Sequence, residues 1–431
     1  MLKKISIYLI GLLPLGLIAG PFVGELILFL IFLIFLFFLI KEKPFYLFQS
    51  KIFKIFFLFW AYIVFVSLFA VENLISLKSS FFYIRFGLYT LAIIYFLISY
   101  ENHLKILYTI YKYTLLFLII DSSYQIFTGK DFFGLSPSDQ ELRRISGPFG
   151  DKQVLGSFIQ KILPVFIYFM IKNFNLLRKI NLLDMLIVTL SIVLIFRSGD
   201  RAAFGLIILF SFLFFIIFKE LRKYFLIFGL LFFTISSLLL IQNETFKKRI
   251  FIDTIGQFKG KHYTQFLSEE ESETNLNFMI FSFIHQTHYS TAFRMFLDKP
   301  FFGHGNKMFR YVCKKYQYKP KYIYKDSFGN DTSKGYGCST HPHNTYMQAL
   351  SEIGIIGFAI LISFFGYLLL KIINLFRNNN GLYPENALLI GIFVNLWPLI
   401  PTGSFFNNWL SMLYFIPVSY YLFEKKYKKR I

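Results

Sequence analysis

The sequence predicts an all-α polytopic membrane protein with about twelve transmembrane helices. Hydrophobic residues make up 56% of the 431 residues, and 60 residues are Phe. The mean hydropathy of +0.56 lies far above the range of a single soluble domain. Uncharged runs such as 26–40 are long enough to cross the hydrocarbon core of a bilayer. Residues 1–20 resemble a signal peptide, but a second apolar run follows at once, so we predict a retained helix.

The apolar runs define the expected order of elements. We predict spans near 5–20, 24–40, 53–71, 79–98, 104–126, 154–172, 180–196, 202–218, 224–241, 343–370, 387–403 and 406–423. The chain then divides into residues 1–241 with nine spans, a long and partly helical periplasmic loop at 242–342, and residues 343–431 with three spans and a basic cytoplasmic tail.

The net charge of +21 fits this topology and needs no nucleic acid partner. Lys and Arg gather in alternate short loops, whereas the loops at 20–24 and 71–79 carry almost none, so we predict both termini in the cytoplasm. The outer segments 127–153 and 242–342 are also basic. These basic residues either keep the outer segments solvated or bind an anionic ligand.

Both cysteines, Cys313 and Cys338, lie in the long outer loop. Two cysteines on one exported loop indicate a disulfide in an oxidising compartment. Two free thiols are the alternative.

Ionisable and polar residues gather near the outer ends of the predicted spans. Charges inside a membrane are costly, so such a cluster indicates an outward-facing polar cavity, with ion pairs between helices as the alternative. The cluster comprises Arg85, Asp121, Gln125, Gln160, Lys161, Arg197, Asp200, Arg201, His341 and His343.

Arginine is the informative residue type here, because its planar fork binds phosphate oxygens in pairs. Arg143, Arg144, Arg197 and Arg201 are expected on the same side of the membrane as the histidines. We therefore expect a diphosphate to be held at the level of the lipid headgroups.

The segment 341-HPHNTYMQALSEIGIIGF-358 places two histidines at the start of a predicted span. Pro342 suits the first turn of a helix, which would put His343 in that turn. The helix dipole would favour its neutral form, a competent general base. A structural capping histidine is the alternative, and His341, just outside the helix, is the weaker candidate for the base.

This segment resembles the O-antigen ligase and polymerase superfamily of bacterial envelope glycan enzymes. His343, Asn344, nine residues, Gly354 and Gly357 match the family's histidine motif. The family's Pro-x-x-Gly-x-Gly turn is similar to 298-DKPFFGHGNKMF-309, and 198-SGDRAAF-204 and 144-RISGPFGDKQ-153 resemble two further family blocks. Upstream of the turn, where family members often carry Arg and Trp, this chain has His285, His288 and Tyr289.

The resemblance implies glycosyl transfer from an undecaprenyl-diphosphate-linked glycan to a hydroxyl of lipid A–core, of a growing glycan or of a protein. His343 would be the base. Arg201 and Arg144 would bind the diphosphate, Arg197 and Arg85 would extend the cationic path, and His341, Asn344, Gly354 and Gly357 would support the site. No metal or other cofactor is implied, and the chain has no Asp-x-Asp and no Walker-type loop.

Two other classes of function stay open. A transporter of lipid-linked glycan would also use cationic residues, but it should carry them near the midplane. A scaffold whose outer loop binds envelope partners would explain the loop but not Arg85 or the histidine pair. Ligase and polymerase are not distinguished.

Overall fold

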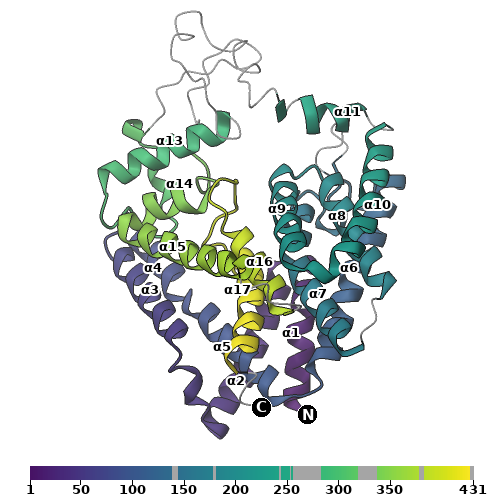
Figure 1. Cartoon of the computed structure of the whole chain (residues 1–431). Coiled ribbons are helices and arrows are strands. Elements are labelled where there is room, and N and C mark those ends of the chain that lie inside the picture. Colours follow the sequence, from purple (N-terminus) through teal and green to yellow (C-terminus); the bar gives the residue numbers. More distant parts are fainter. Residues whose placement is uncertain are drawn as a thin grey trace, which may run out of the picture.

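The computed structural model describes residues 1–137, 144–177, 181–241, 244–252, 254–255, 283–318, 337–377 and 383–427. All regular structure in these residues is helical. The N-terminus and the end of α17 lie together at one end of the molecule, called the lower end here, and α13 and α14 lie at the other, upper end (Figure 1).

Fourteen longer helices occur in the described residues. They are α1 (Leu2–Ala19), α2 (Pro21–Glu42), α3 (Lys51–Ser67), α4 (Asn73–Phe81), α5 (Ile84–Ser99), α6 (His103–Thr128), α7 (Leu155–Leu177), α8 (Leu182–Arg197), α9 (Arg201–Ile217), α10 (Arg222–Ile241), α13 (Phe283–Asp298), α15 (Thr345–Arg377), α16 (Glu385–Asn395) and α17 (Asn408–Leu422). Short helices include α11 (Glu244–Lys247) and α14 (Phe309–Val312).

Seven helical segments in the described residues are long and apolar enough to cross a membrane. They are Leu2–Ala19, Pro21–Glu42, Asn73–Ser99, His103–Thr128, Leu155–Phe174, Lys219–Ile241 and Thr345–Arg377. The all-helical membrane class is therefore confirmed, whereas the count of twelve spans and the side on which the long loop lies remain predictions.

The predicted span 387–403 is wrong in its extent, because α16 ends at Asn395. The chain then runs without α-helix to α17, and several of its backbone groups bind the segment before α15 instead of continuing the helix.

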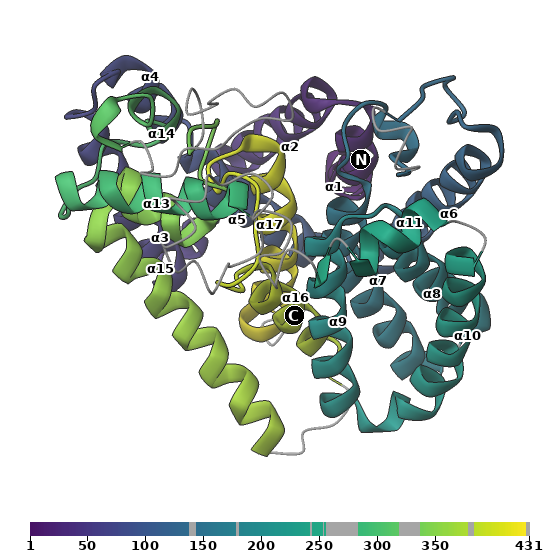
Figure 2. The same ribbon diagram turned by 90° about the horizontal axis from the view of Figure 1, so that it is seen from above.

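The helices form two groups with α16 and α17 between them (Figure 2). One group holds α2–α5 with α13–α15, and the other holds α6–α11. α7 is almost wholly buried and packs against α6, α8, α9, α16 and α17, while α17 also packs against α5. The two middle helices thus join the groups, and α13 lies across the start of α15 at the upper end.

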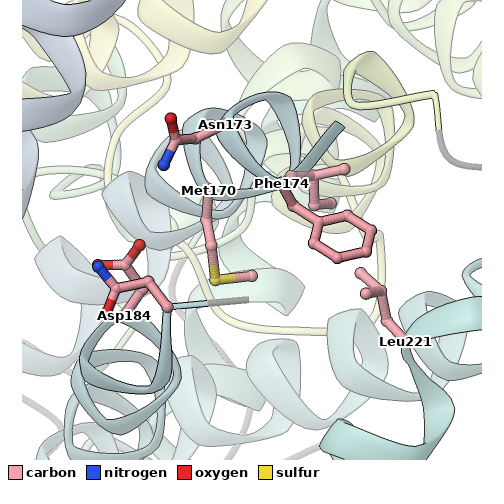
Figure 3. A pocket seen from close by; sticks show the side chains of 7 residues that line it. Met170, Asn173, Phe174, Asp184 and Leu221 are labelled. Atoms are coloured by element: carbon pink, nitrogen blue, oxygen red, sulfur yellow. The ribbon is translucent and has the colours of Figure 1, made fainter. Parts of the chain in front are cut away.

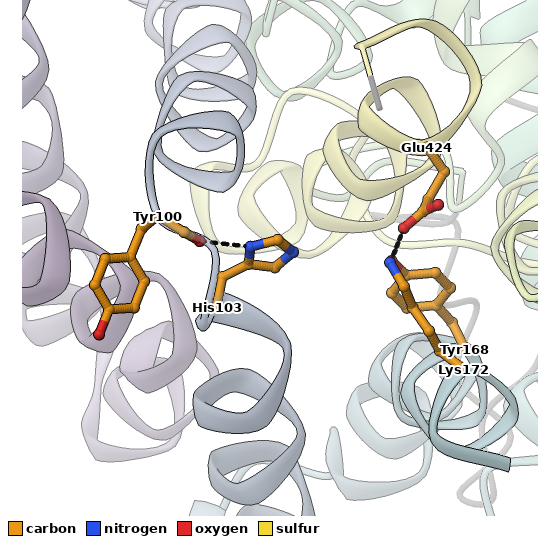
Figure 4. Close-up of polar contacts among 5 residues, drawn as sticks. All are labelled: Tyr100, His103, Tyr168, Lys172 and Glu424. Atoms are coloured by element: carbon orange, nitrogen blue, oxygen red, sulfur yellow. Dashed lines mark hydrogen bonds and ion pairs between the residues drawn. The ribbon is translucent and has the colours of Figure 1, made fainter. Parts of the chain in front are cut away.

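Opposite charges fasten helices at the lower end. Lys172 of α7 pairs with Glu424, which also accepts a hydrogen bond from Tyr168 at 2.6 Å (Figure 4). His103, at the start of α6, lies within 2.7 Å of the carbonyl oxygen of Tyr100. These contacts lie among helix ends and connections.

Two further ion pairs have the same character. Lys3 lies 2.9 Å from Glu42, which joins α1 to α2. Lys112 lies 2.8 Å from Asp184, which joins α6 to α8.

A small pocket also lies in this half of the molecule. It is lined by Met170, Ile171, Asn173, Phe174, Asn181, Asp184 and Leu221 (Figure 3). Its one carboxylate belongs to Asp184, which is held by Lys112 and by the hydroxyl of Tyr108. Among its described lining residues, the pocket therefore offers no unpaired carboxylate for chemistry.

Candidate active site: a histidine cluster between cationic groups

Four of the chain's seven histidines gather at the upper end. The ring centroid of His343 lies 4.1 Å from that of His341, 5.3 Å from that of His288 and 5.8 Å from that of His285. His343 is thus the centre of the cluster.

Two elements supply the cluster. His285 and His288 are three residues apart on α13, so their side chains share one face of that helix. The segment 341–345 supplies the other two and is held by the chain between α16 and α17: Thr402 N–H donates to the carbonyl oxygen of His343 at 2.9 Å. Because α13 packs against α15, the two pairs of histidines meet.

The expectation that His343 lies in the first turn of a helix is wrong. α15 begins at Thr345, and the side-chain oxygen of Asn344 accepts hydrogen bonds from the backbone N–H groups of Tyr346 (2.9 Å) and Met347 (3.1 Å). Asn is among the best N-caps, so the helix starts after it and not at Pro342. His343 precedes the cap with a φ of 54°, a left-handed conformation that is uncommon for residues other than glycine and is frequent at functional sites.

The two histidines of the motif differ in what their ring nitrogens contact. Nδ1 of His341 lies 3.0 Å from Oγ1 of Thr340, and its Nε2 lies 3.3 Å from the carbonyl oxygen of Thr402. Both nitrogens of His341 are therefore engaged. Within the described part of the chain, neither ring nitrogen of His343 has a hydrogen-bond partner. His343 is the member of the pair whose nitrogens are available to a substrate.

All four imidazoles favour the neutral form. Burial lowers the pKa of His343, and burial together with the neighbouring histidines lowers the pKa of His341 to about 3. The pKa values of His285 and His288 are lowered to about 4, again chiefly by burial. The cause at His343 is burial, not the helix dipole expected from the sequence.

Three of the four predicted arginines meet at one corner. Asp200 caps α9 by accepting from Ala203 N–H at 3.0 Å, so the chain turns sharply between Arg197, the last residue of α8, and Arg201, the first of α9. Arg144 donates from Nε to the carbonyl oxygen of Ser198, in this turn, at 3.1 Å. Arg143 lies outside the described residues.

Contacts with Thr254, Phe246 and Gln125 help to hold the arginine corner. Arg201 donates from Nη1 to Oγ1 of Thr254 at 3.0 Å, and the guanidinium of the buried Arg197 lies 4.9 Å from the ring centroid of Phe246. The block that carries Arg144 is held by Gln125, whose side-chain oxygen accepts from the N–H groups of Ser146 and Gly147, each at 2.9 Å.

The corner and the histidine cluster are electrostatic neighbours. The positive charge of Arg201 is one of the causes that lower the pKa of His285, whose ring contacts that of His343. A diphosphate held at Arg201 would thus lie beside the histidines.

Arg85 does not join this corner. Its Nη2 lies 3.0 Å from a carboxylate oxygen of Glu25, which ties α5 to α2. The ion pair between helices, the alternative left open by the sequence, is what the structure shows for this arginine.

The two glycine motifs of the sequence dock onto each other. Gly354 has φ 65° and ψ −169°, a kink within α15. Around it, Ile355 N–H donates to the carbonyl oxygen of Pro300 and Gly305 N–H donates to that of Glu352, both at 2.8 Å. A Cβ on Gly354 would lie 2.2 Å from the carbonyl oxygen of Phe301. Gly354 thus serves the docking of the turn 300–305, and a Cβ on nearby Gly357 would first meet Ile353 of its own helix.

A disulfide fixes the approach to the cluster. Cys313 and Cys338 are joined, with their Cα atoms 5.2 Å apart, and the bond links the end of α14 to the residues just before His341. The histidine segment is thus held by three elements: the turn 300–305, the disulfide, and the segment around Thr402.

Sequence reasoning did not assign roles to several residues at this site: His285, His288, Lys307, Arg310 and Glu352. The sequence signal for the histidines was their rarity. The chain has seven histidines, and four of them lie in this cluster. No group of three or more His, Cys, Asp or Glu side chains among the described residues is arranged to hold a metal ion.

Residues 186–362 match the family model described as O-antigen ligase. The matched segment runs from α8 into α15 and includes Arg197, Arg201, both histidine pairs, Asn344, Gly354 and Gly357. No curated protein matches the chain. The resemblance seen in the sequence is confirmed: the chain carries an O-antigen ligase domain in a helical membrane protein, and the family supports a glycosyltransferase of the ligase or polymerase type.

Proposed function

We propose that the protein transfers a glycan from undecaprenyl diphosphate to a hydroxyl group of an acceptor sugar, on the side of the membrane at which the histidine cluster lies. The observation that carries the proposal is the free imidazole of His343, which touches His285, itself under the charge of Arg201. A base and a diphosphate-binding cation are thus adjacent.

The reaction assigns a role to each part of the site. His343 takes the proton of the acceptor hydroxyl, and that oxygen forms a bond to the anomeric carbon as the bond to the diphosphate oxygen breaks. Arg201, Arg144 and Arg197 bind the diphosphate and stabilise the negative charge that develops on it. Arg85 is left out of this group because it pairs with Glu25.

The remaining motif residues position the base. Asn344 caps α15 and binds the carbonyl oxygen of Pro398 at 2.8 Å, which fixes the backbone beside His343. His341, with both nitrogens engaged, holds the segment to Thr402. Gly354 lets the turn 300–305 dock below it.

The test is transfer by the purified protein in nanodiscs, with chelator present and undecaprenyl-diphosphate-linked glycan as donor. Two acceptors are compared, lipid A–core and a second molecule of lipid-linked glycan. Product on lipid A–core identifies a ligase, and lengthened lipid-linked glycan identifies a polymerase. In sealed vesicles, movement of intact donor across the bilayer without any transfer would contradict the proposal and favour a transporter.

A further inference from the structure

Two cations beside the histidine cluster share a single carboxylate, that of Glu352. Lys307 follows the turn 300–305, and Arg310 lies in α14. Within the described residues, neither side chain makes an ion pair or a hydrogen bond, although both are half-buried. Nε of Arg310 is buried and lacks any partner. A cation withdrawn from water without a partner is costly, so its retention needs a reason.

The nearest carboxylate is used for another purpose. Glu352 is fully buried, and its oxygens accept from the backbone N–H of Phe309 at 3.1 Å and from Nε2 of Gln348 at 2.9 Å. Glu352 therefore fixes the backbone from which Lys307 and Arg310 extend. Lys307 itself has a φ of 62°, in the left-handed region, which adds backbone strain to the cost of its position.

The charges around Lys307 do not balance. Its electrostatic neighbours are Arg310, Arg85, Glu25 and Glu352. Counted with Lys307 itself, these are three cations and two carboxylates, and Arg85 and Glu25 are already paired with each other at 3.0 Å. One positive charge is unmatched. Burial, together with the charge of Arg310, lowers the pKa of Lys307.

The cationic pair and the arginine corner act on different histidines of the cluster. Arg310 is among the charges that lower the pKa of His341, whereas Arg201 acts on His285. Both histidines contact His343. His343 therefore contacts one histidine that is under the charge of Arg201 and another that is under the charge of Arg310.

We propose that Lys307 and Arg310 form a second anion-binding subsite, which takes a phosphate or carboxylate group carried by the acceptor sugar. The assignment to the acceptor rests on the proposed function, in which the arginine corner binds the donor diphosphate and this pair is left for the acceptor. Such a group would neutralise the unmatched charge and place the acceptor hydroxyl within reach of the base. The acceptor is thus an anionic glycan, and a neutral one lacks this contact.

Anion binding can be measured at Lys307 without any transfer. Full-length protein in phosphatidylcholine nanodiscs is treated with acetic anhydride, and acetylation of Lys307 and of the exposed Lys299 is followed by mass spectrometry. Glucose 6-phosphate is the probe and glucose its neutral control. At about ten times its Kd, glucose 6-phosphate should slow acetylation of Lys307 about tenfold. Glucose should have no effect, and Lys299 should react at the same rate throughout.

Variants and a change of lipid separate the possible results. Arg310→Gln should abolish protection, and Arg377→Gln, which alters an exposed arginine of α15, should keep it. If glucose 6-phosphate protects Lys307 no better than glucose does, the subsite is refuted. If phosphatidylglycerol nanodiscs protect Lys307 with no sugar present, the site binds lipid headgroups and the assignment to an acceptor is wrong.

The transfer assay connects the subsite to the reaction. With one synthetic oligosaccharide acceptor made with and without a phosphate group, Arg310→Gln should raise KM for the phosphorylated form about tenfold and leave the KM of the donor unchanged. Equal KM values for both acceptors in the unaltered protein would overturn the proposal. Absence of all transfer, with protection of Lys307 intact, would instead contradict the proposed function alone.

Discussion

The two ends of this protein treat buried charge in opposite ways. At the lower end, Lys3, Lys112 and Lys172 each pair with a carboxylate from another helix, as does Arg85 nearer the histidines. At the histidine end, Arg144 donates to a carbonyl oxygen and Arg201 to a hydroxyl, and Lys307 and Arg310 share the single carboxylate of Glu352.

This difference distinguishes charged residues that hold helices together from charged residues that can bind a ligand. A cation paired with a carboxylate is neutralised and holds two helices together, so it has little left to offer a ligand. Where cations outnumber the carboxylates around them, a net positive charge remains for an anion. We therefore expect the histidine end to bind anions and the lower end to hold helices together.

The sharpest test of the comparison removes the base. His343→Ala should lower transfer by roughly 10²–10⁴-fold, the usual contribution of a general base, while donor binding survives because the arginines remain. His341→Ala is the matched control and should keep measurable transfer, because both its ring nitrogens already bind Thr340 and Thr402. Transfer and donor binding are measured separately on the same preparations. Near-normal transfer by His343→Ala would make this histidine structural.

At the lower end, the corresponding change should affect stability and not chemistry. Glu424→Gln leaves Lys172 without its carboxylate in a mostly buried position, which typically costs about 3–5 kcal/mol. Thermal unfolding in detergent should show a lower Tm. The KM for the donor, measured on protein that remains folded, should be unchanged. A variant with normal Tm but altered KM would show that the two ends do not divide the roles in this way.

Arg201→Lys keeps the charge at the arginine corner but loses the planar fork. A hydrogen bond to a charged group contributes about 1.5–3 kcal/mol, so donor affinity should fall about tenfold to a hundredfold. Arg144→Ala should act in the same direction, and both proteins should still insert and accumulate. Arg85→Lys is the control, since Arg85 pairs with Glu25 and not with the donor. If Arg85→Lys weakened donor binding more than Arg201→Lys, the diphosphate would have to lie elsewhere.

The docking of the turn 300–305 can be tested with one methyl group. Gly354→Ala places a Cβ against the carbonyl oxygen of Phe301 at a φ of 65°, which should cost about 1–3 kcal/mol and displace the segment that carries the histidines. Gly366→Ala, in the same helix, meets nothing within 4 Å and serves as the control. We expect a lower Tm for the first variant only. Equal Tm values for both would mean that the kink is not needed.

The histidine cluster should also make stability depend on pH. The unfolded chain binds protons at His285 and His288 near pH 6.5, whereas the folded protein binds them only near pH 4. Between these values the unfolded state holds more protons, so the free energy of unfolding should fall as the pH falls from about 6.5 to about 4. Tm measured across this range should decrease, and the decrease should be smaller in a His285→Asn, His288→Asn double variant. An equally steep decrease in that variant would assign the effect to other groups.

Much of the site was predictable because it consists of short patterns along the chain. These are the spacing from His343 to Gly354 and Gly357, the pair of cysteines, and the arginines at the ends of apolar runs. Other features needed contacts between distant segments. The partner of Arg85 is Glu25, 60 residues away, and the sequence around either residue does not predict the pairing.

The sequence by itself determined the class of fold and the family of the site, because hydrophobic length fixes membrane helices and because motif residues lie close together in the chain. Only the tertiary structure decided which histidine has free nitrogens, which arginine pairs with a carboxylate and where cations outnumber carboxylates. The physical reason is that burial and pairing depend on packing between helices. At this site, burial and pairing are set by the packing of α13, the turn 300–305 and the segment after α16 around His343.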